Sequence, residues 1–514
     1  MTESLEQPFG LRQFPTGIAG LDRVLSGGLF IGGNYMVMGP PGAGKTILGN
    51  QLCFHHIASG GRALYLSLLA ETSSRLLATL ERFTFYTPDA LGDTITYFSG
   101  SSALEKGGLE ELLQLIRTET RRLRATLLVL DGTTVLEGVS SQQDWIRFLY
   151  GLYVSAEITE CTTILLMQTP QSTDLSREQT IMEGLIELAM PAYGMRAARE
   201  LRVRKFRGSG FLEGRHSYAI TEAGIVVHPR TEELLAAAQI ASPGVAATAE
   251  QESKKRIGPA RLDDMMRGGL PADSITLLLG ASGTGKTLLG SHFLLANATQ
   301  REPALYFGFS ERPSRLERKL ARFGLDITHA RAEGHLEVLW QSPLQPHLDV
   351  SAERLLEAIR RGNIRQLFID GLGGWQRAIG SAERLDLFLT ALFSELQALN
   401  VTTMCSVELP ALFSPTLELP MTVSGIADLA DNLIFLRYVE LESQLYRLLS
   451  ILKMRESDYD PAIREFRITN HGIDVAPTFA SAQAILTGVA VPLSREEQSK
   501  PFPAKAEDAE GRQP

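Results

Sequence analysis

An internal repeat constrains the fold of this chain more than any other feature of its sequence. In each half, a Leu-Asp pair is followed by Gly-Gly-Leu, an apolar segment and a glycine-rich loop ending in Gly-Lys-Thr. The loop lysines are Lys45 and Lys286, and each lies 17 residues after the second glycine of Gly-Gly-Leu. An apolar segment ending in aspartate follows 86 residues after Lys45 and 84 residues after Lys286. Two tandem domains of one fold are therefore predicted.

The length of the chain agrees with two domains, because 514 residues exceed what one hydrophobic core usually supports. We expect the domains to cover residues 8–232 and 254–478. Residues 233–253 are small and polar without apolar periodicity, which indicates a linker. Residues 479–514 are expected to form a C-terminal segment with a disordered, charged and proline-containing tail.

Short apolar segments alternate with helical segments in both halves, which predicts an α/β fold. The apolar segments carry almost no polar residue, as is typical of parallel strands covered by helices on both faces. Each domain should therefore be a mostly parallel sheet flanked by helices. The predicted strands are YMVMG, ALYLSL, TLLVLD and TTILLMQ in the first half and ITLLLG, ALYFGF, QLFID and TTMCSV in the second.

Both glycine-rich loops match the phosphate-binding pattern G-x-x-x-x-G-K-[ST]. Glycine lets backbone N–H groups converge on phosphate oxygens, and the lysine reaches the terminal phosphates. The threonine hydroxyl binds Mg²⁺, and the start of the following helix favours an anion. The predicted nucleotide-binding residues are Gly39, Pro40, Pro41, Gly42, Ala43, Gly44, Lys45 and Thr46 in the first loop, and Gly280, Ala281, Ser282, Gly283, Thr284, Gly285, Lys286 and Thr287 in the second.

Two aspartates complete the predicted metal sites. Asp131 and Asp370 each end an apolar strand, where the aspartate of a phosphate-loop enzyme orients the magnesium shell. A strand-end aspartate can also cap a helix, but the matched spacing in the two repeats favours the metal. Thr46 with Asp131, and Thr287 with Asp370, are thus the candidate metal-binding pairs.

Polar residues at other strand ends are candidates for the catalytic step. Glu71 and Glu311 follow the second strand of each domain, where a carboxylate can orient or deprotonate the attacking water. The alternative is a glutamate in the first turn of a helix, stabilised by the helix dipole. Gln168 and Glu408 end another strand and are candidates to sense the phosphate, with ordinary strand-end polarity as the alternative.

Two basic pairs occupy matching positions late in each repeat. Lys205 alternates with Arg207, and Lys453 with Arg455, along strand-like segments, so that each pair shares one face. Such residues can act in trans on the γ-phosphate bound by a neighbouring subunit. The alternative is a solvated strand face.

Composition restricts the cellular setting. The formal net charge is −9, which argues against a protein that coats nucleic acid. Three scattered cysteines indicate neither a disulfide framework nor a zinc site and fit a reducing cytoplasm. The N-terminus carries no secretory signal pattern, and no long apolar run predicts a membrane span.

Over about residues 10–488 the chain resembles the KaiC family, the ATPases of the circadian clock type with two RecA-like domains. The resemblance is most specific in RLDDMMRGGLPADSITLLLGASGTGKTLL and in DNLIFLRYVELESQLYRLLSILKMRESDYDPAIREFRITNHGIDV. It implies a homo-hexamer with ATP between subunits, an N-terminal domain that hydrolyses ATP and a C-terminal domain that autophosphorylates. FASAQAILTG, residues 479–488, resembles the segment that precedes the family's partner-binding tail, which implies a clock-type or signalling protein partner.

The chain departs from the family at the catalytic carboxylates and at the phosphate acceptor. The family has adjacent glutamates after the second strand of each domain, whereas this chain has Ala70-Glu71 and Ser310-Glu311. The family's phosphorylated Ser-Thr pair aligns with Ala427-Asp428, and alanine has no hydroxyl. Thr422 and Ser424 are the nearby hydroxyls to which autophosphorylation would have to shift.

These observations favour a cytoplasmic, slowly hydrolysing ATPase that forms a ring-shaped regulatory assembly. One alternative is a serine/threonine autokinase with a shifted acceptor. A second is a RecA-type DNA-dependent ATPase, but the segments TPQSTDLSREQT and LPALFSPTLELP contain only one basic residue, Arg177. A third is a scaffold in which nucleotide only holds subunits together.

Overall fold

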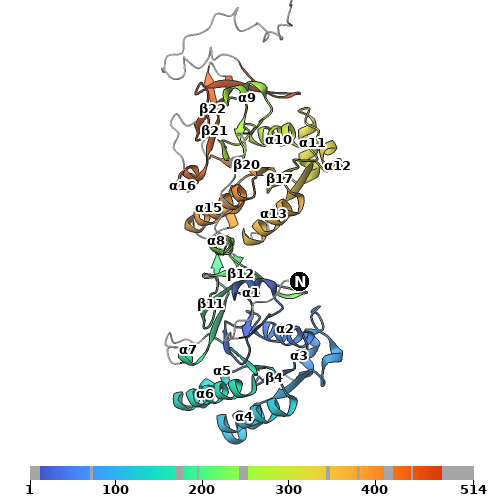
Figure 1. Ribbon diagram of the computed structural model, residues 1–514, viewed down its shortest axis with the longest axis vertical. Helices are drawn as coiled ribbons and strands as arrows, with labels where there is room; N and C mark the ends of the chain where they lie inside the picture. The colour runs from blue at the N-terminus through green and yellow to red at the C-terminus, as the bar shows by residue number, and fades with distance from the viewer. Residues whose placement is uncertain are drawn as a thin grey trace, which may run out of the picture. The chain divides into compact units, whose positions relative to one another are not determined.

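The computed structural model divides into two compact units, Met1–Gly244 and Val245–Pro514 (Figure 1). Each unit contains one large sheet with helices packed against it. The residues that the structure describes are 12–69, 73–169, 178–193, 196–241, 253–342, 348–378, 382–409, 421–441 and 444–476.

The large sheet of the N-terminal domain has the strand order β13-β12-β11-β8-β3-β7-β6-β4-β5. Strands from β5 to β8 in this order are parallel, and β11, β12 and β13 continue the sheet in antiparallel pairing. The strands are β3 (Asn34–Met38), β4 (Ala63–Ser67), β5 (Ile95–Ser99), β6 (Leu127–Asp131), β7 (Thr162–Met167), β8 (Gly184–Ala189), β11 (Glu200–Phe206), β12 (His216–Thr221) and β13 (Gly224–His228). The helices are α1 (Ala19–Val24), α2 (Lys45–Ala58), α3 (Ser73–Leu80), η1 (Pro88–Ala90), α4 (Ser101–Leu123), α5 (Thr134–Val139), α6 (Gln142–Thr159), α7 (Glu178–Ile181) and α8 (Thr231–Ala241), and two small sheets pair β1 (Gln13–Phe14) with β2 (Leu29–Phe30) and β9 (Ala192–Tyr193) with β10 (Arg196–Ala197).

The C-terminal domain repeats this topology strand for strand. Its sheet has the order β18-β17-β19-β20-β16-β21-β22-β23-β24, again with a parallel part and an antiparallel extension that begins at β22. The strands are β16 (Ile275–Gly280), β17 (Ala304–Gly308), β18 (Leu336–Trp340), β19 (Gln366–Asp370), β20 (Thr402–Glu408), β21 (Asn432–Leu441), β22 (Gln444–Met454), β23 (Arg464–Thr469) and β24 (Gly472–Val475). The helices are α9 (Ala260–Met265), α10 (Lys286–Asn297), α11 (Pro313–Ala321), α12 (Ile327–Ala332), α13 (Leu348–Gly362), α14 (Gly373–Ala378), α15 (Ala382–Ala398) and α16 (Met421–Leu429), and a small sheet pairs β14 (Lys254–Lys255) with β15 (Leu270–Pro271).

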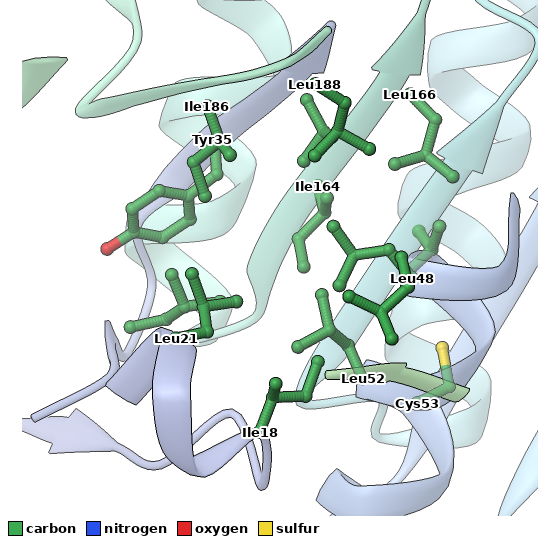
Figure 2. Close-up of a cluster of buried hydrophobic side chains, with 14 of the residues drawn as sticks. Ile18, Leu21, Tyr35, Leu48, Leu52, Cys53, Ile164, Leu166, Ile186 and Leu188 are labelled. Atoms are coloured by element: carbon green, nitrogen blue, oxygen red, sulfur yellow. The ribbon is translucent and has the colours of Figure 1, made fainter. Parts of the chain in front are cut away.

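The central strands explain why the apolar segments carry so few polar residues. In β3, Tyr35 and Val37 belong to the core cluster beneath α2, whereas Met36 and Met38 belong to the cluster beneath α4 and α6. Figure 2 shows the first cluster, in which side chains of α2 meet those of β3, β7 and β8. Because successive strand residues point to opposite faces, both faces must be apolar when helices cover both. The predicted α/β fold class is confirmed in both halves.

A glycine five positions into the helix after each loop allows that helix to lie close to the sheet. A Cβ atom at Gly49 of α2 would lie 2.7 Å from Cδ1 of Leu166, and one at Gly290 of α10 would lie 2.2 Å from Cζ of Phe368. Both distances are too short for any larger side chain unless the neighbouring residues move. Glycine therefore brings the start of each helix, which carries the loop lysine, onto the sheet.

The segment between the domains differs in part from the sequence prediction. Residues 233–253 are predicted to form a linker, and helix α8 covers the first part of this range, as far as Ala241. The run LLAAAQIA has high helix propensity, and it forms a helix although the segment lacks clear apolar periodicity. Within the described part of the chain, no helix is long and apolar enough to cross a membrane.

Candidate functional site

Each phosphate-binding loop connects the central strand of a sheet to the helix that lies beneath it. Gly44 and Gly285, the last residues before α2 and α10, have φ angles of 94° and 105°. These left-handed conformations favour glycine and turn the chain directly into the helix. The loops thus lie at the start of α2 and α10, where backbone N–H groups are unpaired and the helix dipole favours an anion.

The two loop lysines fold back over their own loops. Nζ of Lys45 donates hydrogen bonds to the carbonyl oxygens of Gly39 (2.7 Å) and Pro40 (3.0 Å). Nζ of Lys286 makes the matching bonds to Gly280 and Ala281, both at 2.7 Å. Each ammonium group is therefore held over the loop, where phosphate oxygens can replace the carbonyl oxygens as acceptors.

Burial lowers the pKa of Lys45 and of Lys286, because the charged ammonium loses water. Asp131 acts in the opposite direction on the pKa of Lys45, as do Glu408 and Asp370 on that of Lys286. Bound phosphate would add negative charge beside each lysine and so favour the ammonium form. The loops are thus electrostatically matched to an anionic ligand.

Beside each loop, a threonine is hydrogen-bonded to the strand-end aspartate. Oγ1 of Thr46 donates to Oδ2 of Asp131 at 2.9 Å, and Oγ1 of Thr287 donates to Oδ2 of Asp370 at 2.8 Å. Hydroxyl and carboxylate oxygens are the ligands that Mg²⁺ prefers. The donor set therefore fits a magnesium ion shared with nucleotide phosphates. No cluster of three or more His, Cys, Asp or Glu side chains suited to metal binding occurs among the residues described.

The sequence interpretation missed two tyrosines that hold these aspartates. The phenol of Tyr65 donates to Oδ2 of Asp131 at 2.7 Å, and that of Tyr306 donates to Oδ2 of Asp370 at 2.6 Å. Burial, and next the nearby aspartate, raise the pKa of each tyrosine well above its ordinary value, so both phenols remain protonated donors. The repeat contained the signal, because both second strands begin Ala-Leu-Tyr.

Among the described residues, the aspartate of the C-terminal site has one side-chain donor more than that of the N-terminal site. Oγ of Ser406 donates to Oδ1 of Asp370 at 2.8 Å, so both carboxylate oxygens of this aspartate are engaged. The matching position on β7 is Leu166, which cannot donate. The two sites therefore share the threonine and tyrosine contacts, and Ser406 adds a further hydrogen bond to Asp370.

Of the two candidate catalytic glutamates, the structure describes Glu311. It lies between β17 and α11, where its Oε1 accepts a hydrogen bond from Nζ of Lys319 at 2.8 Å. Its Oε2 is buried without a hydrogen-bond partner among the described residues. Ser310 beside it is exposed. Glu71 and Ala70 lie outside the described residues, so the role of Glu71 remains a prediction.

The basic residues predicted to act in trans lie at the ends of β11 and β22. Within one chain, Nζ of Lys205 donates to the carbonyl of Met182 at 2.6 Å, and Nζ of Lys453 donates to that of Ala430 at 2.7 Å. A guanidinium nitrogen of Arg455 donates to the carbonyl of Asp428 at 2.7 Å. The acceptors follow α7 or belong to the end of α16, so these side chains bind helix ends of their own chain.

Three further residues were candidates from the sequence, and the structure places each of them. Glu408 ends β20 and is close enough to Lys286 to raise its pKa, whereas the backbone N–H of Gln168 donates to Oγ1 of Thr134 at 2.8 Å. Arg207 follows β11, and its backbone N–H donates to the carbonyl of Glu183 at 2.8 Å. The segments 170–177, 410–420 and 477–514, and the side chains of Thr422 and Ser424, lie outside the description.

Fold and site together define a P-loop nucleotide-binding protein with two tandem RecA-like domains. A family model for the ATPase domain of KaiC matches residues 14–232 and 256–479. The chain therefore belongs to the KaiC ATPase family, as the sequence resemblance predicted. It is similar to the circadian clock oscillator protein KaiC 1 of Synechocystis sp., with 26% identity over 96% of this chain and 94% of the relative. It is also similar to the circadian clock oscillator protein KaiC of Synechococcus elongatus, with 25% identity over 94% of this chain and 93% of the relative.

The hydrogen bond from Tyr306 to Asp370 yields a test of the metal site. In a Lys45→Ala background, where the second loop is the remaining intact one, Tyr306→Phe should weaken Mg-ATP binding roughly three- to tenfold, because a buried carboxylate loses one donor. ATP binding without Mg²⁺ should change little. Tyr446→Phe is the control, since its phenol bonds to Gln444 at an exposed position. Calorimetry with and without Mg²⁺ measures both affinities, and equal losses in the two conditions would contradict a role in metal binding.

Proposed function

We propose that this protein is a slow ATPase with two nucleotide sites per chain, which works as a ring-shaped regulatory or signalling assembly. The observation that carries this proposal is that both domains place a loop lysine, a threonine and a strand-end aspartate in the same arrangement. Membership of the KaiC ATPase family supports ATP as the substrate.

In each site the loop and the helix start would bind the phosphates through backbone N–H groups. Lys45 and Lys286 would leave the loop carbonyls and engage the terminal phosphates. Thr46 with Asp131, and Thr287 with Asp370, would hold Mg²⁺. When bound, this ion would supply positive charge that offsets the negative charge developing on the phosphates.

Glu71 and Glu311 would orient or deprotonate the attacking water. We infer slow hydrolysis because each domain has one carboxylate where the family has two. In the C-terminal domain, Lys319 also competes with water for Oε1 of Glu311. An attacking water would therefore have fewer free carboxylate oxygens to accept its proton.

The ring is inferred to be a homo-hexamer with ATP between subunits. Lys205, Arg207, Lys453 and Arg455 would then contact the nucleotide of the adjacent subunit. A phosphate is a stronger acceptor than the carbonyl oxygens that now bind Lys205 and Lys453, because its hydrogen bonds are charge-assisted. Binding across the interface would thus replace bonds within the chain.

We place this assembly in the cytoplasm, with a clock-type or signalling protein as partner at the C-terminal segment 479–488. The three cysteines, Cys53, Cys161 and Cys405, are buried and unpaired, which suits a reducing compartment. The related proteins named above are circadian clock oscillator proteins. That role supports a regulatory function here.

The residues at the positions of the family's phosphate acceptors, Ala427 and Asp428, argue against the autokinase alternative. Ala427 is buried on α16, and Asp428 beside it is exposed and carries a fixed negative charge. A phosphate added at Ser424 or Thr422 would be repelled by that charge. A DNA-dependent ATPase is a second alternative, and DNA binding that weakens with salt would reveal it. A scaffold that only binds nucleotide is a third alternative, and a single-turnover hydrolysis measurement would distinguish it from an enzyme.

Loop variants test the two nucleotide sites. Lys45→Ala and Lys286→Ala each remove the positive charge that faces the terminal phosphates. Each single variant should keep about one bound nucleotide per chain, and the double variant should keep none. Equilibrium dialysis with labelled ATP measures the stoichiometry. Full binding by the double variant would show that the loops are not the nucleotide sites.

Glutamine variants test the catalytic glutamates. Glu311→Gln in a Lys45→Ala chain, and Glu71→Gln in a Lys286→Ala chain, keep the shape of the side chain but remove its ability to accept a proton. ATP should still bind, while turnover falls roughly 10²-fold or more. Phosphate release at saturating ATP is the measurement. Unchanged turnover would mean that these residues only stabilise the start of a helix.

Intact-mass spectrometry tests the autokinase alternative. After incubation with Mg-ATP, we expect no stoichiometric gain of phosphate, because the family's acceptor positions hold Ala427 and Asp428. A chain with Ala427→Ser and Asp428→Thr restores the two hydroxyls and is the matched comparison. A mass gain of about one phosphate on the chain without these substitutions, mapped to Ser424 or Thr422, would establish that the acceptor has shifted.

A further inference from the structure

A groove with a strongly basic wall opens beside Glu311 in the C-terminal domain. It has a volume of about 580 Å³ and is lined by Glu311, Arg315, Arg318, Lys319, Arg322 and Phe323. We call it the basic groove. Its volume lies within the range of about 300–1,000 Å³ that is usual for small-molecule sites.

The positive charge of the basic groove is largely uncompensated. The single acidic residue of α11 is Glu317, and it is paired with Arg331 of α12. Among the residues that the structure describes, Arg315 and Arg322 have no acidic partner, and Arg318 donates to the backbone carbonyl of Ser314. The only acidic contact of a groove cation within the described chain is that of Lys319 with Glu311.

The spacing of these cations is unfavourable for the helix itself. Arg315 is three and four residues before Arg318 and Lys319, and Arg322 is four and three residues after them. Residues at these separations are neighbours on a helix surface, where like charges repel. Arg318 and Lys319 also lie in the last turn of α11, where the helix dipole favours positive charge. A bound anion would remove the repulsion among the four cations.

The N-terminal domain lacks the groove's central charges at matching positions. Counting from Glu71 and Glu311, Ala78 corresponds to Arg318, and Thr79 corresponds to Lys319. Both residues lie on α3, which occupies the place of α11 in the first repeat. The repeat therefore shows that this fold does not require a cation at either position.

We propose that the basic groove binds a small ligand carrying two or more phosphate groups, and that this ligand stimulates the C-terminal ATPase by drawing Lys319 away from Glu311. Arginine suits such a ligand because its planar guanidinium makes paired hydrogen bonds to phosphate. Once Lys319 is bound to the ligand, Oε1 of Glu311 is free to accept a hydrogen bond from water. The stimulation rests on the proposed ATPase function, whereas the binding does not.

The ligand has two conceivable sources, a free polyphosphate and the phosphate tail of the ATP held by the second loop. Inorganic tripolyphosphate distinguishes them when both loops are disabled. A Lys45→Ala/Lys286→Ala chain should bind about one tripolyphosphate in a calorimetric titration at low salt. If binding requires an intact loop, the groove only accommodates the tail of loop-bound ATP, and the separate site is wrong.

Variants taken from the other repeat locate the binding. Adding Arg318→Ala and Lys319→Thr to the same chain should weaken tripolyphosphate binding at least tenfold, roughly the effect of losing two charge-assisted contacts. Adding Lys106→Ala and Arg121→Ala removes two exposed charges from α4 of the N-terminal domain and should change little. Arg322→Gln is a second groove variant in case the first does not fold. Equal binding by the groove and control variants would overturn the proposal.

Turnover tests the second half of the proposal. In a Lys45→Ala chain at saturating Mg-ATP and fixed free Mg²⁺, tripolyphosphate should raise the ATPase rate severalfold. Lys319→Thr should raise the rate without ligand and abolish the response. Tripolyphosphate binding without any hydrolysis would refute the ATPase function but leave the site intact. Hydrolysis that responds to neither the ligand nor Lys319→Thr would refute the stimulation.

Discussion

One hydrogen bond in each domain fixes the rest of the site. It joins the threonine that follows the loop lysine to the aspartate at the end of a nearby strand. It requires the start of the helix, the loop and the end of the strand to meet at one edge of the sheet. The close helix–sheet contact at Gly49 and Gly290, and the left-handed glycines before each helix, serve this geometry. Tyr65 and Tyr306 donate to the same aspartate oxygen as the threonine and so add a second contact that holds the carboxylate in place.

The fold was largely predictable because the same motifs occur at matched spacing in both halves of the sequence. Matched spacing predicts that Asp131 and Asp370 share metal sites with the loop threonines, and each aspartate accepts a hydrogen bond from its threonine. The segments YMVMG and ITLLLG form strands, as predicted, and the structure places both at the centre of their sheets. Ser406 could not be found in this way, because its counterpart is Leu166 and the repeat offers no agreement there. Helix α8 was missed because alanine-rich segments form helices without an apolar stripe.

The pairing of Glu311 with Lys319 was also beyond sequence reasoning. Two residues eight apart, one before a helix and one within it, carry no characteristic motif, and their contact depends on the path of the chain after β17. The trans-acting candidates illustrate the same limit. Their alternation predicts that each pair shares one strand face and either acts in trans or faces solvent, but it does not reveal that the lysines donate to carbonyl groups at helix ends. The sequence shows which residues are charged, but not which hydrogen-bond acceptor each of them contacts.

The two-sided core has a consequence for the origin of the chain. In the N-terminal domain the central strands divide their side chains between two clusters, so neither layer of helices can be removed without exposing one apolar face of the sheet. A fragment smaller than a whole domain would present that face to other chains and aggregate. A duplication that copies the complete nine-stranded unit leaves both faces of each sheet covered. The repeat in the sequence is correspondingly as long as a domain, and the strands of the two large sheets follow the same order.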